Sequence, residues 1–407
     1  MSIEVRRLRD DAEFDAYLHA AIYAFNSARD GSQLERYHQL YDRDWCLGAF
    51  DGGQLVAGLT IVPFEQHMLG ARIPLGGIAT VATLPEHRRG GYVGALLRAA
   101  LVEMRAAGQP LSGLYTPHFS LYRRFGWEIA NRVVSYAFGP KTMHTRIPRP
   151  DGSFRRITPD DWRDLAALRE PFAAARNGAM LRTERRWRTH VFSEYLRGQH
   201  DVVIWSNAAG EPRGYAAYVQ QHRSTGDPFG ETVLRVIDWV ALDGDAYSAL
   251  LNYLMSHDLT DRIILVVSED EPVIAAFDEP VHLTQPPGAW TGMLLRLVDL
   301  PRAIDARPAP PDASGLEVTL AVTDDAAPWN AGTWRIASSE GRMAAERTNA
   351  SSEIELDATA LGPIYNGFAH PAEVARVGQL KVNEPDAIGR MGRMFATPFR
   401  PFCPDDF

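Results

Sequence analysis

The chain has 407 residues, of which 45% are hydrophobic and 23% charged, and this length suits two or three packed domains. The formal net charge of −9 argues against a surface for nucleic acid or anionic lipid, and two cysteines do not make a disulfide framework. The charged opening residues and the lack of a ~20-residue apolar run predict a cytoplasmic protein without membrane insertion.

The first section, residues 1–148, alternates strand and helix signals. We expect strands over 3–8, 45–50, 54–64, 73–84, 111–117 and 127–140. We expect a helix over 10–25 opened by Asp10 and Asp11, a second that follows Gly91 and ends at Gly108, and a short one over 119–126. Asp-Gly-Gly at 51–53 is typical of a hairpin turn. These elements predict an α/β or α+β sheet with helices packed on it.

The same order of elements returns after a linker over 139–152. A strand and capped helix, a hairpin, a strand running into an amphipathic helix, and a further strand fill residues 149–298. A Pro- and Ala-rich break at 305–315 precedes short strands and helical segments up to residue 407. We therefore expect three domains, over 1–148, 149–298 and 299–407.

The strongest chemical signal is the stretch TVATLPEHRRGGYVGALL. A strand runs through Pro85 into Arg88, Arg89, Gly90 and Gly91, and then directly into the long helix. A helix N-terminus offers unpaired N–H groups, glycines allow close approach of the backbone, and arginines add charge, so the pattern suits a pyrophosphate. An ordinary strand–turn–helix with solvent-facing arginines is the open alternative.

Two motifs in this order carry a family resemblance. The spacing P-x-x-R-x-x-G and the later segment YTPHFSLYRRFGWEIA resemble the coenzyme A loop and the Tyr-containing segment of GNAT acetyltransferases. The three-part layout and the final Phe407 resemble the Eis (enhanced intracellular survival) group. The resemblance implies tandem GNAT-like domains, of mixed sheets flanked by helices, followed by an α/β domain like sterol carrier proteins. It also implies a homohexamer.

The resemblance further assigns roles to individual residues. The acetyl-CoA site would comprise Val81, Ala82, Thr83, Arg88, Arg89, Gly90, Gly91, Tyr92, Val93, Gly94, Pro117 and His118. Tyr122 would be the general acid and the Phe407 carboxylate the general base. Asp405 and Asp406 would attract a cationic amine. For Tyr122, ordinary core packing with a satisfied hydroxyl is the alternative.

The resemblance thus implies an acetyl-CoA-dependent N-acetyltransferase acting on a primary amine, such as an aminoglycoside, a polyamine or a lysine. A lipid or sterol carrier with vestigial GNAT domains is the alternative. The histidines and cysteines form no zinc-type motif, so we expect no metal. In the second copy the loop reads VALDGDAYSALL, where Asp243 and Asp245 replace the arginines. Because carboxylates repel a pyrophosphate, we expect that copy not to bind acetyl-CoA.

Overall fold

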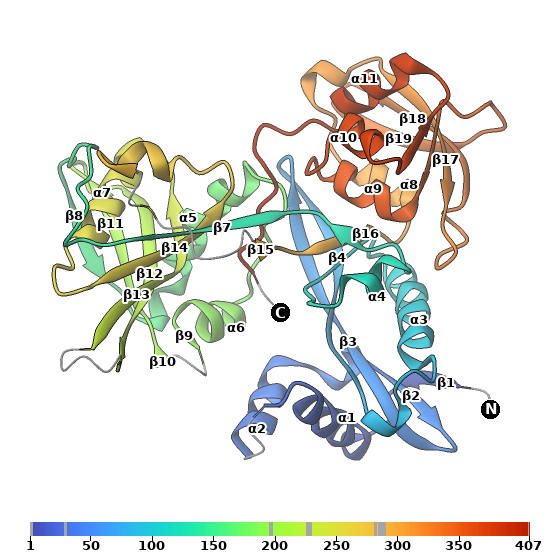
Figure 1. Ribbon diagram of the computed structural model, residues 1–407, viewed down its shortest axis with the longest axis horizontal. Coiled ribbons are helices and arrows are strands. Elements are labelled where there is room, and N and C mark those ends of the chain that lie inside the picture. Colours follow the sequence, from blue (N-terminus) through green and yellow to red (C-terminus); the bar gives the residue numbers. More distant parts are fainter. Residues whose placement is uncertain are drawn as a thin grey trace. The chain divides into compact units, whose positions relative to one another are not determined.

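A computed structural model describes residues 3–27, 31–194, 198–224, 230–280, 283, 290–405 and 407 (Figure 1). The chain forms two compact units. The first comprises residues 1–131, 292–398 and 405–407, and the second comprises residues 132–291 and 399–404. Each unit is therefore built from segments that are far apart in the sequence.

The first unit contains a seven-stranded sheet with the order β1-β2-β3-β4-β5-β16-β6. Its strands are β1 (Glu4–Arg7), β2 (Cys46–Asp51), β3 (Gln54–Met68), β4 (Ala71–Thr83), β5 (Leu111–Leu114), β6 (Glu128–Ile129) and β16 (Leu294–Leu297). Its helices are α1 (Asp11–Ala24), α2 (Gly31–Leu40), α3 (Tyr92–Ala106) and α4 (Phe119–Arg123). The β4–β5 pair is parallel and the other pairs are antiparallel.

Helices α1 and α3 cover opposite faces of this sheet. Asp10 caps α1 by accepting a hydrogen bond from the Glu13 N–H at 2.9 Å, as the sequence predicted. Along β2, Leu47 packs with the buried stripe of α3, whereas Cys46 packs with buried residues of α1. This alternation follows from the two-residue period of a strand and defines an α1 face and an α3 face.

The first unit also contains a five-stranded sheet with the order β19-β18-β17-β20-β21. Its strands are β17 (Glu317–Thr323), β18 (Gly332–Ser339), β19 (Arg342–Arg347), β20 (Ile354–Asp357) and β21 (Leu380–Val382). The accompanying helices are α8 (Leu300–Ala306), α9 (Ala358–Tyr365), α10 (Pro371–Arg376) and α11 (Pro385–Met394). Buried Arg307 donates to the main-chain oxygens of Tyr365, Met394 and Phe395, which ties the end of α11 to α9.

The second unit contains another seven-stranded sheet, with the order β15-β7-β14-β13-β12-β11-β8. Its strands are β7 (Arg132–Phe138), β8 (Gly152–Arg156), β11 (Asp201–Asn207), β12 (Pro212–Arg223), β13 (Glu231–Ala241), β14 (Arg262–Ser268) and β15 (Trp290–Thr291). A small pair joins β9 (Ser193–Glu194) to β10 (Gly198–Gln199). The helices are α5 (Trp162–Ala174), α6 (Glu184–Arg186) and α7 (Gly244–Met255).

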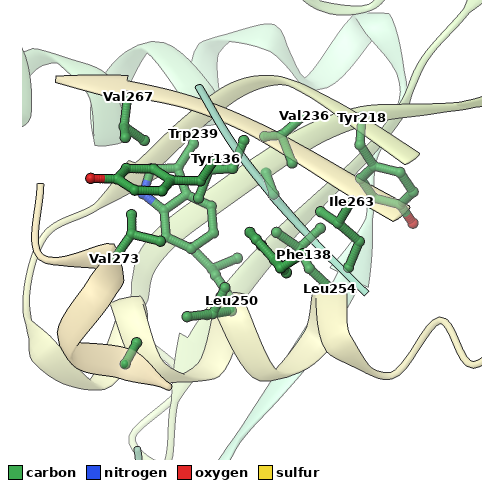
Figure 2. Packing of buried hydrophobic residues seen from close by; sticks show 14 of the residues in the cluster. Tyr136, Phe138, Tyr218, Val236, Trp239, Leu250, Leu254, Ile263, Val267 and Val273 are labelled. Carbon is green, nitrogen blue, oxygen red and sulfur yellow. The ribbon is translucent and has the colours of Figure 1, made fainter. Parts of the chain in front are cut away.

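The two seven-stranded sheets exchange strands along the chain. We expected one strand over 127–140 to close the first sheet. Instead β6 stays in the first sheet, whereas β7 pairs with β14 in the second. Figure 2 shows Tyr136 and Phe138 of β7 lying in the core of the second sheet beside Trp239 and Ile263. In return, β16 pairs with β5 in the first sheet. The strand pattern predicted an extended segment but carried no information about its partner.

Candidate active site

Strands β4 and β5 are paired for only part of their length. Their parallel ladder ends at Ile78 and Leu114, and β4 continues beyond it to Thr83. The predicted site residues Val81, Ala82 and Thr83 lie on this continuation. An edge without a neighbouring strand can offer main-chain groups to a ligand, because they have no ladder partner on that side.

The same continuation of β4 contains a bulge. The pairing with β3 passes from Ala79 opposite Thr60 directly to Ala82 opposite Gly58, so Thr80 and Val81 have no register partner. Thr80 has φ +53°, in the left-handed region that β-branched residues rarely occupy. Bulges with such backbone angles often re-aim groups at functional sites.

The loop after β4 leads into an uncapped helix N-terminus. Gly91 is the N-cap of α3 with φ +85°, and no side chain bonds to the first turn. Arg89 also has a positive φ, at +65°, while Arg88 and Arg89 are both exposed. Free N–H groups, the helix dipole and two guanidinium groups together favour a polyphosphate.

Tyr92, the first residue of α3, has a local partner. Its hydroxyl donates to the Asp51 carboxylate at 2.8 Å, which raises the pKa of Tyr92. Asp51 closes β2, so this bond ties the loop to the β2–β3 turn. Val93 and Gly94 follow in the first turn and are half-buried. Tyr92 therefore fixes the helix start, and the backbone of 92–94 remains available for a ligand.

One buried polar atom on β4 supports the predicted fit of acetyl-CoA. The Oγ1 of Thr83 is buried and has no hydrogen-bond partner among the described residues. Ala82 beside it is fully packed, and Val81 and Thr83 are half-buried. The pantetheine arm carries amide groups that can pair with main-chain groups and a hydroxyl. The residues present thus fit this group.

Pro117 and His118 lie between β5 and α4 and are both exposed. The His118 N–H donates to Thr116 Oγ1 at 2.8 Å, and His118 is the N-cap of α4. The structure thus places these two residues beyond the end of β5, where the ladder with β4 has already ended. Their predicted contact with acetyl-CoA remains a prediction.

Tyr122 is a buried residue of α4 that packs on the α3 face. Its ring meets Trp127 edge to face, with centroids 6.4 Å apart, and it shares a cluster with Leu96 and Leu97. Burial raises the pKa of Tyr122 to about 12. The hydroxyl has no hydrogen-bond partner among the described residues. Tyr122 is thus a protonated donor at neutral pH whose hydroxyl is free to serve a ligand.

A buried ion pair supports the turn after Tyr122. Arg296 of β16 bonds the main-chain oxygen of Phe125 and pairs with Asp324 at 2.5 Å, and both charged side chains are buried. Asp324 also accepts from Asn330 Nδ2 and the Ala327 N–H. Sequence reasoning missed this network, because its members lie far apart and no motif marks them.

Phe407 lies against the strands on the opposite face. Its ring is 4.8 Å from that of Phe64 and 5.4 Å from that of Tyr115, measured between centroids. A Cβ added to Gly77 would lie 2.6 Å from the Phe407 ring, whereas one on Gly76 would meet Met104 of α3. Adjacent strand residues point to opposite faces, so Phe407 lies on the face away from α3.

Of the two acidic residues predicted to attract the amine, the structure describes Asp405 but not Asp406. Asp405 is fully buried, so it faces protein rather than solvent. Asp406 lies outside the described residues. Their attraction of a cationic amine remains a prediction. The contacts of Phe407 with Phe64 and Tyr115 were not foreseen, because an aromatic side chain alone does not reveal its partner.

The corresponding loop of the second sheet carries an acidic N-cap. Asp243 caps α7 by accepting from the Ala246 N–H at 2.8 Å and pairs with Arg213 at 2.7 Å. At the bulge of β13, buried Asp238 pairs with Arg182 and accepts from the Tyr215 hydroxyl. The N-terminus of α7 is thus capped by an acidic side chain, whereas the N-terminus of α3 begins at Gly91 and has no side-chain cap. That the second copy does not bind acetyl-CoA stays a prediction.

Within the part of the chain that the structure describes, no group of three or more His, Cys, Asp or Glu side chains is arranged to hold a metal ion. Among the described helices, none is long and apolar enough to cross a membrane.

Comparison with known protein families divides the chain into three. Residues 4–130 and 178–297 each match a model described as an acetyltransferase (GNAT) domain, and residues 300–404 match a sterol carrier protein domain. The chain thus consists of tandem GNAT domains, with mixed sheets flanked by helices, and a C-terminal domain like sterol carrier proteins.

Similar proteins span the whole layout. An uncharacterized N-acetyltransferase of Streptomyces avermitilis is 27% identical over all of both chains. The N-acetyltransferase Eis of Mycobacterium tuberculosis is 24% identical, over 86% of this chain and 85% of its own. The crystal structure of Eis1 from Mycobacterium abscessus covers 100% of both chains with a TM-score of 0.85 and 26% identity.

The fold and the site therefore define an N-acetyltransferase of the GNAT superfamily, a class that uses acetyl-CoA as co-substrate. Within that class, the chain is similar to the Eis N-acetyltransferases in its three-part layout.

Proposed function

We propose that this enzyme uses acetyl-CoA to acetylate a primary amine of a cationic acceptor, such as an aminoglycoside, a polyamine or a lysine-like amine. The observation that carries the proposal is the uncapped N-terminus of α3 directly after the unpaired end of β4. The pyrophosphate would lie on residues 88–94 and the pantetheine arm along 81–83. Residues 117–118 would form the far edge of the site.

The proposed chemistry is direct transfer. An amine is ordinarily protonated, with a pKa of roughly 10.4, so it must lose a proton before its nitrogen attacks the thioester carbon. The Phe407 carboxylate accepts that proton, directly or through water. A C–N bond forms, the C–S bond breaks, and Tyr122 donates its proton to the departing sulfur. Burial raises the pKa of Tyr122 to about 12, so its hydroxyl still holds a proton to donate when the C–S bond breaks.

The positions of Tyr122 and Phe407 support the assignment of Tyr122 as the acid and the Phe407 carboxylate as the base. Tyr122 packs with α3, and the Phe407 ring lies on the opposite face of the sheet. A base on one face and an acid on the other would meet a substrate at the open end between β4 and β5. Donor and acceptor could then enter from opposite sides, and the product amide could leave without displacing coenzyme A.

The proposal extends to the domain division, the assembly and the location of the protein. The chain would divide functionally at about residues 148 and 298, with the second GNAT domain as scaffold and the sterol-carrier-like domain supplying the terminal carboxylate. Assembly as a homohexamer and a cytoplasmic location complete it. Light scattering of the purified protein tests the hexamer.

A thiol-release assay with a panel of amines tests the central claim. We expect turnover with at least one aminoglycoside or polyamine, and calorimetry should give one acetyl-CoA per chain. Calorimetry with a fatty acid is run in parallel. Binding of the fatty acid without binding of acetyl-CoA would establish the carrier alternative instead.

A further inference from the structure

The bulge of β4 is held from the α1 face by one buried side chain. The Tyr17 hydroxyl donates to the main-chain oxygen of Thr80 at 2.8 Å and lies 2.9 Å from Thr60 Oγ1. Tyr17 is fully buried, and burial raises its pKa well above the ordinary value. The hydroxyl is therefore a permanent donor to the bulge.

The ring of Tyr17 is fixed by a glycine. A Cβ added to Gly58 would lie 2.4 Å from Tyr17 Cδ2, so the ring occupies the space that a side chain would need. Gly58 is the β3 residue on one side of the bulge, opposite Ala82. Ring and hydroxyl thus contact both strands at the place where their register slips.

Holding the Thr80 carbonyl also orients the next N–H. The Thr80 carbonyl and the Val81 N–H belong to one planar trans peptide and point in opposite directions. With the carbonyl directed at Tyr17 on the α1 face, the Val81 N–H points away from that face. Val81 has no register partner in β3, and the ladder to β5 has already ended at Ile78.

We propose that Tyr17 is a positioning residue for acetyl transfer. Its hydroxyl keeps Thr80 in the left-handed conformation and thereby aims the Val81 N–H at the thioester oxygen, where negative charge develops during attack. The inference rests on the proposed function above. Preorganised donors of this kind act on the transition state, so their loss lowers kcat more than it weakens binding.

Tyr17→Phe tests the proposal, because the ring stays and only the hydroxyl is lost. We expect kcat to fall about tenfold, with the Kd of acetyl-CoA within about twofold of wild type. Tyr365→Phe is the matched control. Its fully buried hydroxyl also donates to a main-chain oxygen at 2.8 Å, that of Ala303, outside the proposed site. Equal kcat values for the two variants would overturn the proposal.

A second measurement needs no substrate. Hydrogen exchange of the free protein should become faster over residues 79–83 in Tyr17→Phe and stay unchanged there in Tyr365→Phe. Unchanged exchange over 79–83 in Tyr17→Phe would overturn the role of Tyr17. An inactive wild type whose exchange responds in the expected way would instead refute the proposed function alone.

The variant Thr80→Gly tests whether Tyr17 acts through the backbone conformation of Thr80. Glycine adopts a positive φ without steric cost, so the bulge would depend less on the clamp. In the Thr80→Gly background we expect Tyr17→Phe to lower kcat by no more than about threefold. The same tenfold loss in both backgrounds would show that Tyr17 does not act through the conformation of Thr80.

Discussion

The ring of Phe407 packs edge to face on Tyr115, the residue that follows β5, with centroids 5.4 Å apart and planes at 73°. The last residue of the sequence therefore lies where β4 and β5 part. A group attached to that ring is fixed relative to the site by aromatic packing.

Extending the chain beyond Phe407 by Gly-Ser-Gly should lower kcat at least 100-fold. The added residues convert the carboxylate into a neutral amide and move the charge away, which removes the proposed base. The same tripeptide placed before Met1 is the control and should leave kcat unchanged. Normal turnover of the C-terminally extended enzyme would refute the role of Phe407.

Tyr122→Phe should lower kcat by about 100-fold at pH 7, with little change in the Kd of acetyl-CoA. Burial raises the pKa of Tyr122 to about 12, so the wild-type residue stays protonated and adds no falling limb to the pH–rate profile below pH 10. The thiol of coenzyme A has a pKa near 8.5 and needs no proton above it. The loss should therefore shrink between pH 7 and pH 9.5; a constant loss would exclude proton donation.

Replacing Arg88 and Arg89 together by Gln should weaken acetyl-CoA binding by roughly 30-fold, because two charge-assisted contacts to phosphate are lost. The binding of acetyl-pantetheine, which lacks the pyrophosphate, should be affected far less. Asp243→Ala in the second domain is the control and should leave both affinity and a stoichiometry of one unchanged. Residual binding of one acetyl-CoA at wild-type affinity in the double variant would place the site elsewhere.

Asp324→Ala should destabilise the protein by about 3–5 kcal/mol, because Arg296 is left buried without its counterion. The control is Glu317→Ala, whose partner Arg335 is 48% exposed; an exposed pair contributes at most about 1 kcal/mol. Urea unfolding measures both. A loss at Asp324 no larger than at Glu317 would show that the buried pair does not hold the turn after Tyr122.

Local signals in the sequence predicted local structure well. The stripe of Leu96, Leu97 and Ala100 gave α3, and Asp10 caps α1 as expected. Helix α2 was not predicted; its apolar contacts come from Leu34 and Tyr37, which are only partly buried against the α1 cluster. Strand β7 was placed in the wrong sheet because alternation reveals a strand but not its partner.

The candidate site could be predicted only in part from the sequence, because some of its contacts join residues that are far apart in the chain. Arg88, Gly90 and Gly91 form a contiguous motif, so their position at the start of α3 followed from spacing. Tyr17 and Thr80 are 63 residues apart and carry no motif. A positive φ at a threonine cannot be inferred from its type, since the surrounding structure imposes it. Contacts of this kind become visible only in three dimensions.

The exchange of strands has a consequence for synthesis on the ribosome. The first sheet lacks the strand between β5 and β6 until residues 294–297 have emerged from the ribosome, so this sheet cannot be completed before then. A nascent chain stalled before that point exposes the β5 edge, where another chain can pair. Cutting this gene between its domains would therefore yield an aggregation-prone fragment rather than a minimal enzyme.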